Sequence, residues 1–74
     1  MKNLEQARVG NFEKVQGVAP LAPIKIKRRL LELGFTKGQS VKVVRKSLIG
    51  KTFLVELRGY TLTLRQDVAK LILI

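Results

Sequence analysis

Residues 53–65 have a period of two, and this pattern limits the possible folds of the chain more than any other feature. The positions that share one phase before Gly59 are Phe53, Val55 and Leu57, and those after it are Tyr60, Leu62 and Leu64. Because successive side chains of a strand point to opposite faces, this period predicts two strands. The glycine between them predicts a hairpin, so the chain builds at least part of a sheet from these residues.

Two further segments extend this sheet on the N-terminal side. Residues 41–46 also have a period of two, and residues 47–51 follow them as a loop. Farther upstream, residues 12–18 predict a first strand that bends at Gly17 and stops before Pro20, since a proline has no backbone N–H to donate to a neighbouring strand.

One amphipathic helix is predicted over residues 23–33. Pro23 suits the first helical position because its ring fixes φ, and Gly34 stands where a helix C-cap favours a residue without a Cβ. At about 100° per residue, one arc of this helix is apolar and consists of Ile26, Leu30 and Leu33. The opposite face is basic and consists of Lys25, Arg28 and Arg29, with Lys27 at its edge.

The C-terminal segment completes the predicted sheet. Residues 66–70 predict a short helical turn, and the apolar residues 71–74 predict a closing strand, because an unpaired apolar end would promote aggregation. Five strands with one inserted helix in 74 residues predict a mainly β fold, a small closed or nearly closed SH3-like barrel. We expect a single domain over residues 1–74. The glycines assigned to turns are Gly34, Gly38 and Gly59.

The charge balance is strongly basic, with 15 Lys and Arg against 5 Asp and Glu and a formal net charge of +10. Such a charge favours an acidic protein surface, a nucleic acid or an anionic lipid as partner. Cysteine is absent, which makes a reduced compartment the default, and no apolar run approaches the roughly 20 residues of a membrane-spanning helix. We therefore expect a cytoplasmic protein that does not insert directly into a membrane.

The residue inventory argues against catalysis and against a resident metal or cofactor. The sequence has no His and no Cys, Asp67 lacks a carboxylate partner at helical or strand spacing, and no Gly-rich phosphate loop follows a strand. Transition metals favour His, Cys or clustered carboxylates, whereas the acidic residues here are scattered. They are Glu5, Glu13, Glu32, Glu56 and Asp67. We expect a binding protein, not an enzyme, with no cofactor; a weak metal site through a carboxylate or an amide stays open.

The basic helix face is the first candidate contact with a partner. Its residues are Lys25, Lys27, Arg28 and Arg29. The face either docks onto an acidic protein or is a solvated surface that keeps a small domain soluble, and we weigh these interpretations equally. Arg28 and Arg29 would be the better contacts, since guanidinium groups pair bidentately with carboxylates and phosphates.

Leu48 and Ile49 are the second candidate contact, because they are apolar residues in a predicted loop between Ser47 and Gly50. Packing back onto the barrel is the simpler interpretation, and exposure for a partner is the functional one.

Residues 28–44 resemble the signature of the FeoA family, a basic helix ending in Leu-Gly, a step to a second glycine, and a Val-rich strand. The matching residues are Arg28-Arg29-Leu30-Leu31-Glu32-Leu33-Gly34-Phe35-x-x-Gly38-x-x-Val41-x-Val43-Val44. Residues 59–65 resemble the family's strand of glycine, aromatic, alternating aliphatic residues and arginine, and Ala69-x-x-Ile72 resembles its closing strand. The resemblance covers residues 4–74.

This resemblance implies an SH3-like barrel that acts as an accessory or regulatory protein of ferrous iron uptake. The implied partner is the cytosolic GTPase region of FeoB, a membrane iron transporter. Kinship with the C-terminal SH3-like domains of iron-dependent repressors is also implied; since no DNA-binding domain precedes the barrel, we expect a free-standing FeoA protein. Self-association stays open, as does the choice between effects on GTP hydrolysis, transporter gating and assembly.

A basic barrel that binds nucleic acid, such as a ribosome-associated module, is the alternative function. The net charge of +10 supports it through attraction to phosphates. The aromatic residues do not, because three of the four are expected at core-like positions and leave no platform for stacking bases. They are Phe12, Phe35, Phe53 and Tyr60.

The purified chain should hydrolyse no nucleotide and should retain no stoichiometric iron after desalting. It supplies neither a phosphate-binding loop nor the soft ligands that hold a transition metal. Nucleotide turnover and elemental analysis of the desalted protein check this prediction, and one equivalent of tightly bound iron would contradict it.

Overall fold

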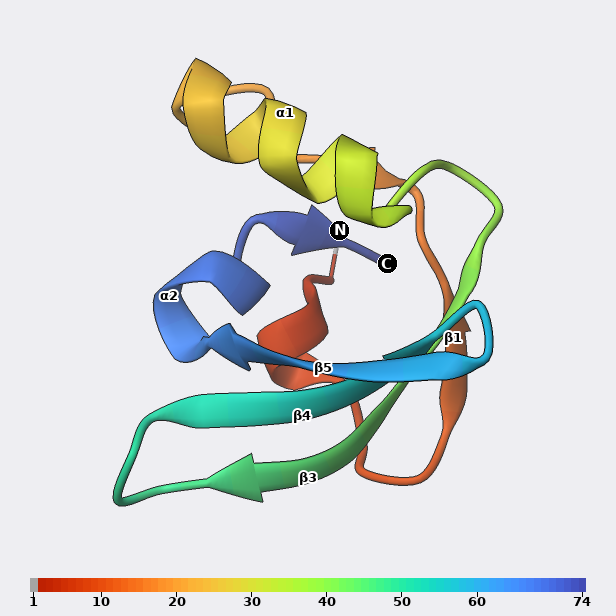
Figure 1. Cartoon of the computed structure of the whole chain (residues 1–74), viewed down its shortest axis with the longest axis vertical. Coiled ribbons are helices and arrows are strands. Elements are labelled where there is room, and N and C mark those ends of the chain that lie inside the picture. Colours follow the sequence, from red (N-terminus) through yellow and green to blue (C-terminus); the bar gives the residue numbers. More distant parts are fainter. Residues whose placement is uncertain (1) are drawn as a thin grey trace.

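The structure is a computed structural model that describes residues 2–74. Its main sheet has four antiparallel strands in the order β1-β3-β4-β5 (Figure 1). The bounds of these strands are Phe12–Lys14 for β1, Ser40–Ser47 for β3, Thr52–Leu57 for β4 and Tyr60–Arg65 for β5. The mainly β architecture expected from the alternating residues is therefore confirmed.

The predicted first strand is divided in two at Gly17. Its second half, β2 (Gly17–Val18), pairs with β6 (Ile72–Leu73) in a separate two-stranded sheet. Gly17 has a φ of +148°, a conformation that favours glycine, and the chain turns there from one sheet to the other. The expected closing strand is thus confirmed, but the barrel is not closed, because the break at Gly17 leaves two sheets instead of one.

The β4–β5 hairpin forms as predicted. Leu57 pairs with Tyr60, so the loop has only Arg58 and Gly59, which have φ values of +54° and +84°. Positive φ at both positions is the mark of a type I′ turn, whose twist matches that of the flanking strands. Gly59 therefore has the turn role expected of it.

A bulge in β3 changes the simple alternation expected for residues 41–46. Val43 pairs with Val55, but Arg45 pairs with Leu54, so Val44 has no partner of its own on β4. One extra residue on a strand reverses the faces of the residues that follow it. Arg45 is exposed as a result, and Lys46 takes the face of Phe53 and lies 5.2 Å from the centre of its ring.

The helix α1 spans Ile24–Leu33, and Pro23 caps it instead of being its first helical residue. Gly34 ends it with a φ of +110°, and the next amide, of Phe35, donates to the carbonyl of Leu30 over 3.0 Å. This is the glycine C-cap expected from the sequence. Two short helices, η1 (Leu4–Gln6) and α2 (Gln66–Ala69), complete the fold.

The core lies between α1, the concave face of the main sheet and the β2–β6 pair (Figure 1). Both ends of the chain contribute to it. Its largest fully buried side chains are Phe35, Leu4, Leu30, Leu57, Ile72, Val15, Val41, Val43 and Val55.

Replacing Gly34 with Val should destabilise the fold by about 2 kcal/mol, which lowers the melting temperature by roughly 10 °C. A side chain strains a residue at this φ, and a Cβ at Gly34 would lie 2.8 Å from Cδ of Arg58. Thermal unfolding followed by circular dichroism measures the effect. Gly50→Ala is the matched control, because a Cβ there meets its neighbours only at 3.5 Å. Equal melting temperatures for the Gly34 variant and the wild type would show that the cap contributes nothing.

Candidate partner-docking groove

An apolar groove lies between α1 on one side and β5 and α2 on the other. Its volume is about 490 Å³. The apolar part of its lining consists of Ile26, Leu30, Leu33, Leu62, Leu64 and Val68. We call this feature the docking groove.

The groove exists because α1 covers the sheet incompletely. Of its apolar arc, only Leu30 is fully buried, whereas Ile26 and Leu33 are half-buried. On the facing side, β5 is an edge strand of the main sheet, and Leu62 on it is also only half-buried. The helix and the edge strand therefore leave apolar surface between them that no other described segment covers.

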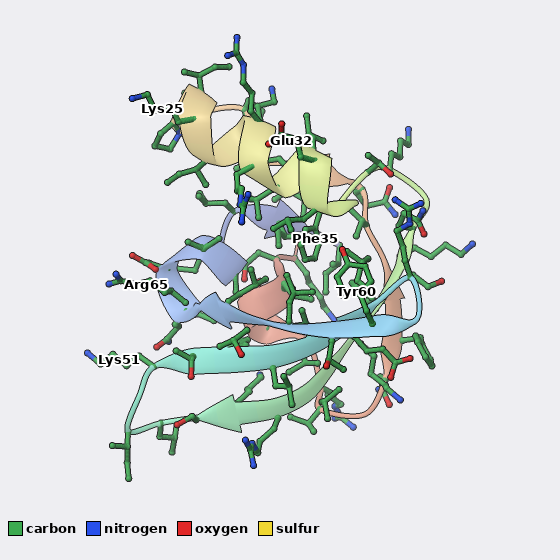
Figure 2. All side chains as sticks on the ribbon, viewed as in Figure 1. Lys25, Glu32, Phe35, Lys51, Tyr60 and Arg65 are labelled. Carbon is green, nitrogen blue, oxygen red and sulfur yellow. The ribbon has the colours of Figure 1, made fainter. Side chains whose placement is uncertain are left out.

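The rim of the docking groove is basic. Lys25 and Arg29 line it from α1, and Arg65 lines it from the end of β5. Figure 2 shows Lys25 and Arg65 on the same side of the molecule, on either side of the space between the helix and β5. Arg65 Nε lies 3.6 Å from Asp67 Oδ1, so one of the three cations is partly balanced by a carboxylate. An apolar segment with acidic residues beside it matches this lining.

The structure divides the predicted basic face. Lys25 and Arg29 lie on the groove, whereas exposed Arg28 and half-buried Lys27 are not part of its lining. Arg65 was not predicted as a candidate contact. Its only signal in the sequence was its place at the end of an alternating strand, and only the tertiary fold brings that strand end to the N-terminal half of α1.

The apolar loop residues lie elsewhere. Leu48 is 90% exposed and Ile49 is 100% exposed, so the interpretation in which they pack back onto the barrel is wrong. The loop that holds them joins β3 to β4 and lies at the end of the molecule opposite α1 (Figure 1). The two predicted contact regions therefore do not form one surface.

Tyr60 ties the edge strand to the end of the helix. Its hydroxyl donates a hydrogen bond to the carbonyl of Leu33, one of the terminal helix carbonyls that have no partner within α1. Figure 2 shows the Tyr60 ring beneath the C-terminal end of α1, next to Phe35. This contact fixes the distance between α1 and β5 at one end of the docking groove.

The structure buries only two of the four aromatic residues, whereas three were expected at core-like positions. Phe35 and Phe53 are buried, but Phe12 on the short edge strand β1 is 59% exposed. The Lys42 ammonium lies 4.7 Å from the centre of its ring and occupies one face of it. The ring is thus a partly covered surface for stacking.

The described residues contain no group of three His, Cys, Asp or Glu side chains able to hold a metal ion. Within residues 2–74, no helix has the length and apolar character needed to cross a membrane.

A family model for the FeoA domain matches residues 2–74. The chain belongs to the FeoA family. The resemblance noted in residues 28–44 and 59–65 is thereby confirmed over nearly the whole length.

Solved FeoA structures share the fold. The zinc complex of Stenotrophomonas maltophilia FeoA, described as an SH3-domain protein and a candidate ferrous iron transport activating factor, is 33% identical. The match covers 99% of this chain and 88% of that one, with a TM-score of 0.86. A FeoA-like protein from Clostridium acetobutylicum is 30% identical over 97% and 81% of the two chains, with a TM-score of 0.84. The SH3-like fold expected from the sequence is confirmed by these matches. A comparison with curated proteins gives no match.

A manganese-dependent transcriptional repressor also contains this fold. The match covers 96% of this chain and 39% of the repressor, with 18% identity and a TM-score of 0.84. At this identity, the likeness concerns the fold alone.

Replacing Tyr60 with Phe should lower the stability of this FeoA-family chain by about 1 kcal/mol, because the Leu33 carbonyl loses its partner. Thermal unfolding should show a melting temperature lower by roughly 5 °C. Thr61→Val, at the neighbouring exposed position, is the control and should leave the temperature within about 1–2 °C of the wild type. A Tyr60→Phe variant as stable as the wild type would show that the hydroxyl does not hold the helix end.

Proposed function

We propose that this chain is a cytoplasmic accessory protein of ferrous iron uptake that binds the cytosolic region of a FeoB-type membrane transporter. Membership of the FeoA family supports the link to ferrous iron transport. The observation that carries the proposed mode of binding is the docking groove, which combines an apolar lining with the basic residues Lys25, Arg29 and Arg65.

The groove suits a short segment of the transporter that has a large apolar side chain with acidic neighbours. Burying one such side chain contributes about 1.5–3 kcal/mol, which is the larger part of the binding energy in this arrangement. Charge pairs at a solvated rim add little affinity, but they raise the association rate and make it sensitive to salt. Arg29 is the rim residue best suited to a carboxylate, because a guanidinium binds both of its oxygens.

The alternative is binding of nucleic acid, which the net charge of +10 favours. The two functions predict that binding depends on different basic residues. Phosphates attract basic residues over the whole surface, whereas a partner segment in the docking groove depends on Lys25 and Arg29 more than on Arg28.

Reversing the groove charges with the double substitution Lys25→Glu and Arg29→Glu should weaken binding to the transporter's cytosolic region at least about tenfold. The substitutions replace attraction by repulsion at two positions on the helix side of the groove. Pull-down and titration calorimetry with the purified cytosolic region, with and without guanine nucleotide, measure the change.

Arg28→Glu is the matched control, since Arg28 is an exposed arginine on the same helix but does not line the groove. It should reduce binding only about twofold, and all variants should melt within a few degrees of the wild type because exposed charges contribute little to stability. Equal losses for Arg28→Glu and the double variant would contradict the groove as the binding site. If the double variant keeps its transporter binding but loses RNA binding, and RNA binding by the wild type falls steeply with salt, the nucleic-acid function is favoured instead.

A further inference from the structure

Leu48 and Ile49, which we call the apolar tip, are the surface feature that the docking groove leaves unexplained. They are 90% and 100% exposed. The loop that carries them is well defined, because the amide of Gly50 donates to Ser47 Oγ over 3.2 Å. Beyond it, Lys51 adopts a positive φ of 51° and leads directly into β4. The apolar tip is therefore a fixed projection at the end of the β3–β4 hairpin.

A basic hollow of about 720 Å³ lies directly beside the apolar tip. Its cationic side chains are those of Lys51, Arg65 and Lys70. Two of these cations are partly balanced, since Arg65 Nε lies 3.6 Å from Asp67 Oδ1 and Lys70 Nζ lies 3.8 Å from Glu5 Oε2. Lys51 forms no ion pair with any residue between 2 and 74. In Figure 2, Lys51 and Arg65 extend outward from the same side of the molecule.

We propose that the apolar tip and the basic hollow together bind the surface of an anionic phospholipid bilayer. Leu48 and Ile49 enter the boundary between headgroups and acyl chains, and Lys51, Arg65 and Lys70 lie at the level of the lipid phosphates. Apolar side chains that project beyond a group of cations match the order of layers in such a membrane, where the charged headgroups lie outside the hydrocarbon. The contact is peripheral: only these two side chains enter the boundary, and no helix among residues 2–74 spans the bilayer.

The shape and chemistry of the tip favour a bilayer over a folded partner. A stable protein interface usually buries more than about 1,000 Å² with good shape complementarity, and a convex projection of two residues supplies much less. Aliphatic side chains also cannot stack on nucleic acid bases as aromatic rings do. A bilayer instead adapts to a projection, and its negative potential strengthens binding by about fivefold for each basic residue near the surface.

Sedimentation with lipid vesicles tests the proposal. At about 0.1 M salt, the wild-type chain should bind vesicles of equal parts phosphatidylglycerol and phosphatidylcholine, and should bind pure phosphatidylcholine much less. The double substitution Leu48→Ser and Ile49→Ser should reduce binding to the anionic vesicles at least about tenfold, because two apolar side chains no longer leave water. Leu21→Ser is the matched control: Leu21 is 97% exposed but lies between β2 and α1, and its loss should change nothing.

Two further pairs of variants distinguish a local contact at the apolar tip from general attraction of a basic protein to anionic vesicles. One pair changes charge, and the other introduces a fluorescent Trp. Lys51→Glu should reduce binding at least about fivefold, and Lys37→Glu, an exposed lysine between α1 and β3, should reduce it less. Because the chain has no Trp, a single introduced one reports its own surroundings. The emission of Ile49→Trp should shift to the blue with anionic vesicles, and that of Leu21→Trp should not.

Wild-type vesicle binding by the serine double variant would overturn the proposal, as would equal emission shifts of the two Trp variants. RNA binding that depends on Leu48 and Ile49 would also overturn it and make the tip a nucleic-acid contact. These residues are exposed, so the variants should fold normally, and thermal unfolding checks this. The proposal does not rest on the transporter function, because the docking groove shares only Arg65 with it and is tested at Lys25 and Arg29 with a protein partner.

Discussion

The corner at the C-terminal end of α1 is the constraint on which the rest of the structure depends. Leu30 and Phe35 are both buried, and Gly34 between them takes a positive φ that lets the chain reverse within two residues. Tyr60 adds a hydrogen bond from β5 to the same end of the helix. The helix is therefore anchored at its C-terminal end, whereas Ile24 at its other end is exposed. The docking groove runs along the same helix from Lys25 to Leu33, so a helix anchored at one end both completes the core and leaves apolar surface for a partner.

The two binding surfaces that we propose use the same basic composition in different ways. At the docking groove, cations surround an apolar concavity that fits one side chain of a protein. At the β3–β4 loop, cations lie behind an apolar projection that fits a soft, negatively charged surface. Arg65 contributes to the lining of both, which makes the end of β5 the place where they meet. A protein that assists a membrane transporter could use both surfaces at once, because the docking groove lies between α1 and β5, whereas the β3–β4 loop with the apolar tip lies at the end of the molecule opposite α1 (Figure 1).

The fold alone would not have distinguished these uses. A manganese-dependent repressor contains the same fold with a TM-score of 0.84 at 18% identity, and it uses it as one part of a longer chain. Function is determined by side chains on a shared backbone. In this chain, the informative ones are exposed residues such as Arg29 and Ile49, which contribute little to folding.

The sequence by itself determined the local elements. Its period of two gave the β4–β5 hairpin, and Pro23 and Gly34 bounded the helix to within one residue, because turns, caps and strand alternation depend on neighbours in the chain. The apolar C-terminus likewise predicted a closing strand, since such a segment must find a partner.

Only the tertiary structure decided how these elements meet. The bulge at Val44 interrupts the predicted alternation of β3, and the break at Gly17 leaves two sheets instead of one closed barrel. Which basic residues share a groove depends on where β5 passes beneath α1, so Arg65 joined Lys25 while Arg28 did not. Exposure of the apolar tip and of Phe12 was decided in the same way, because burial is set by contacts between residues distant in sequence, and no local pattern contains that information.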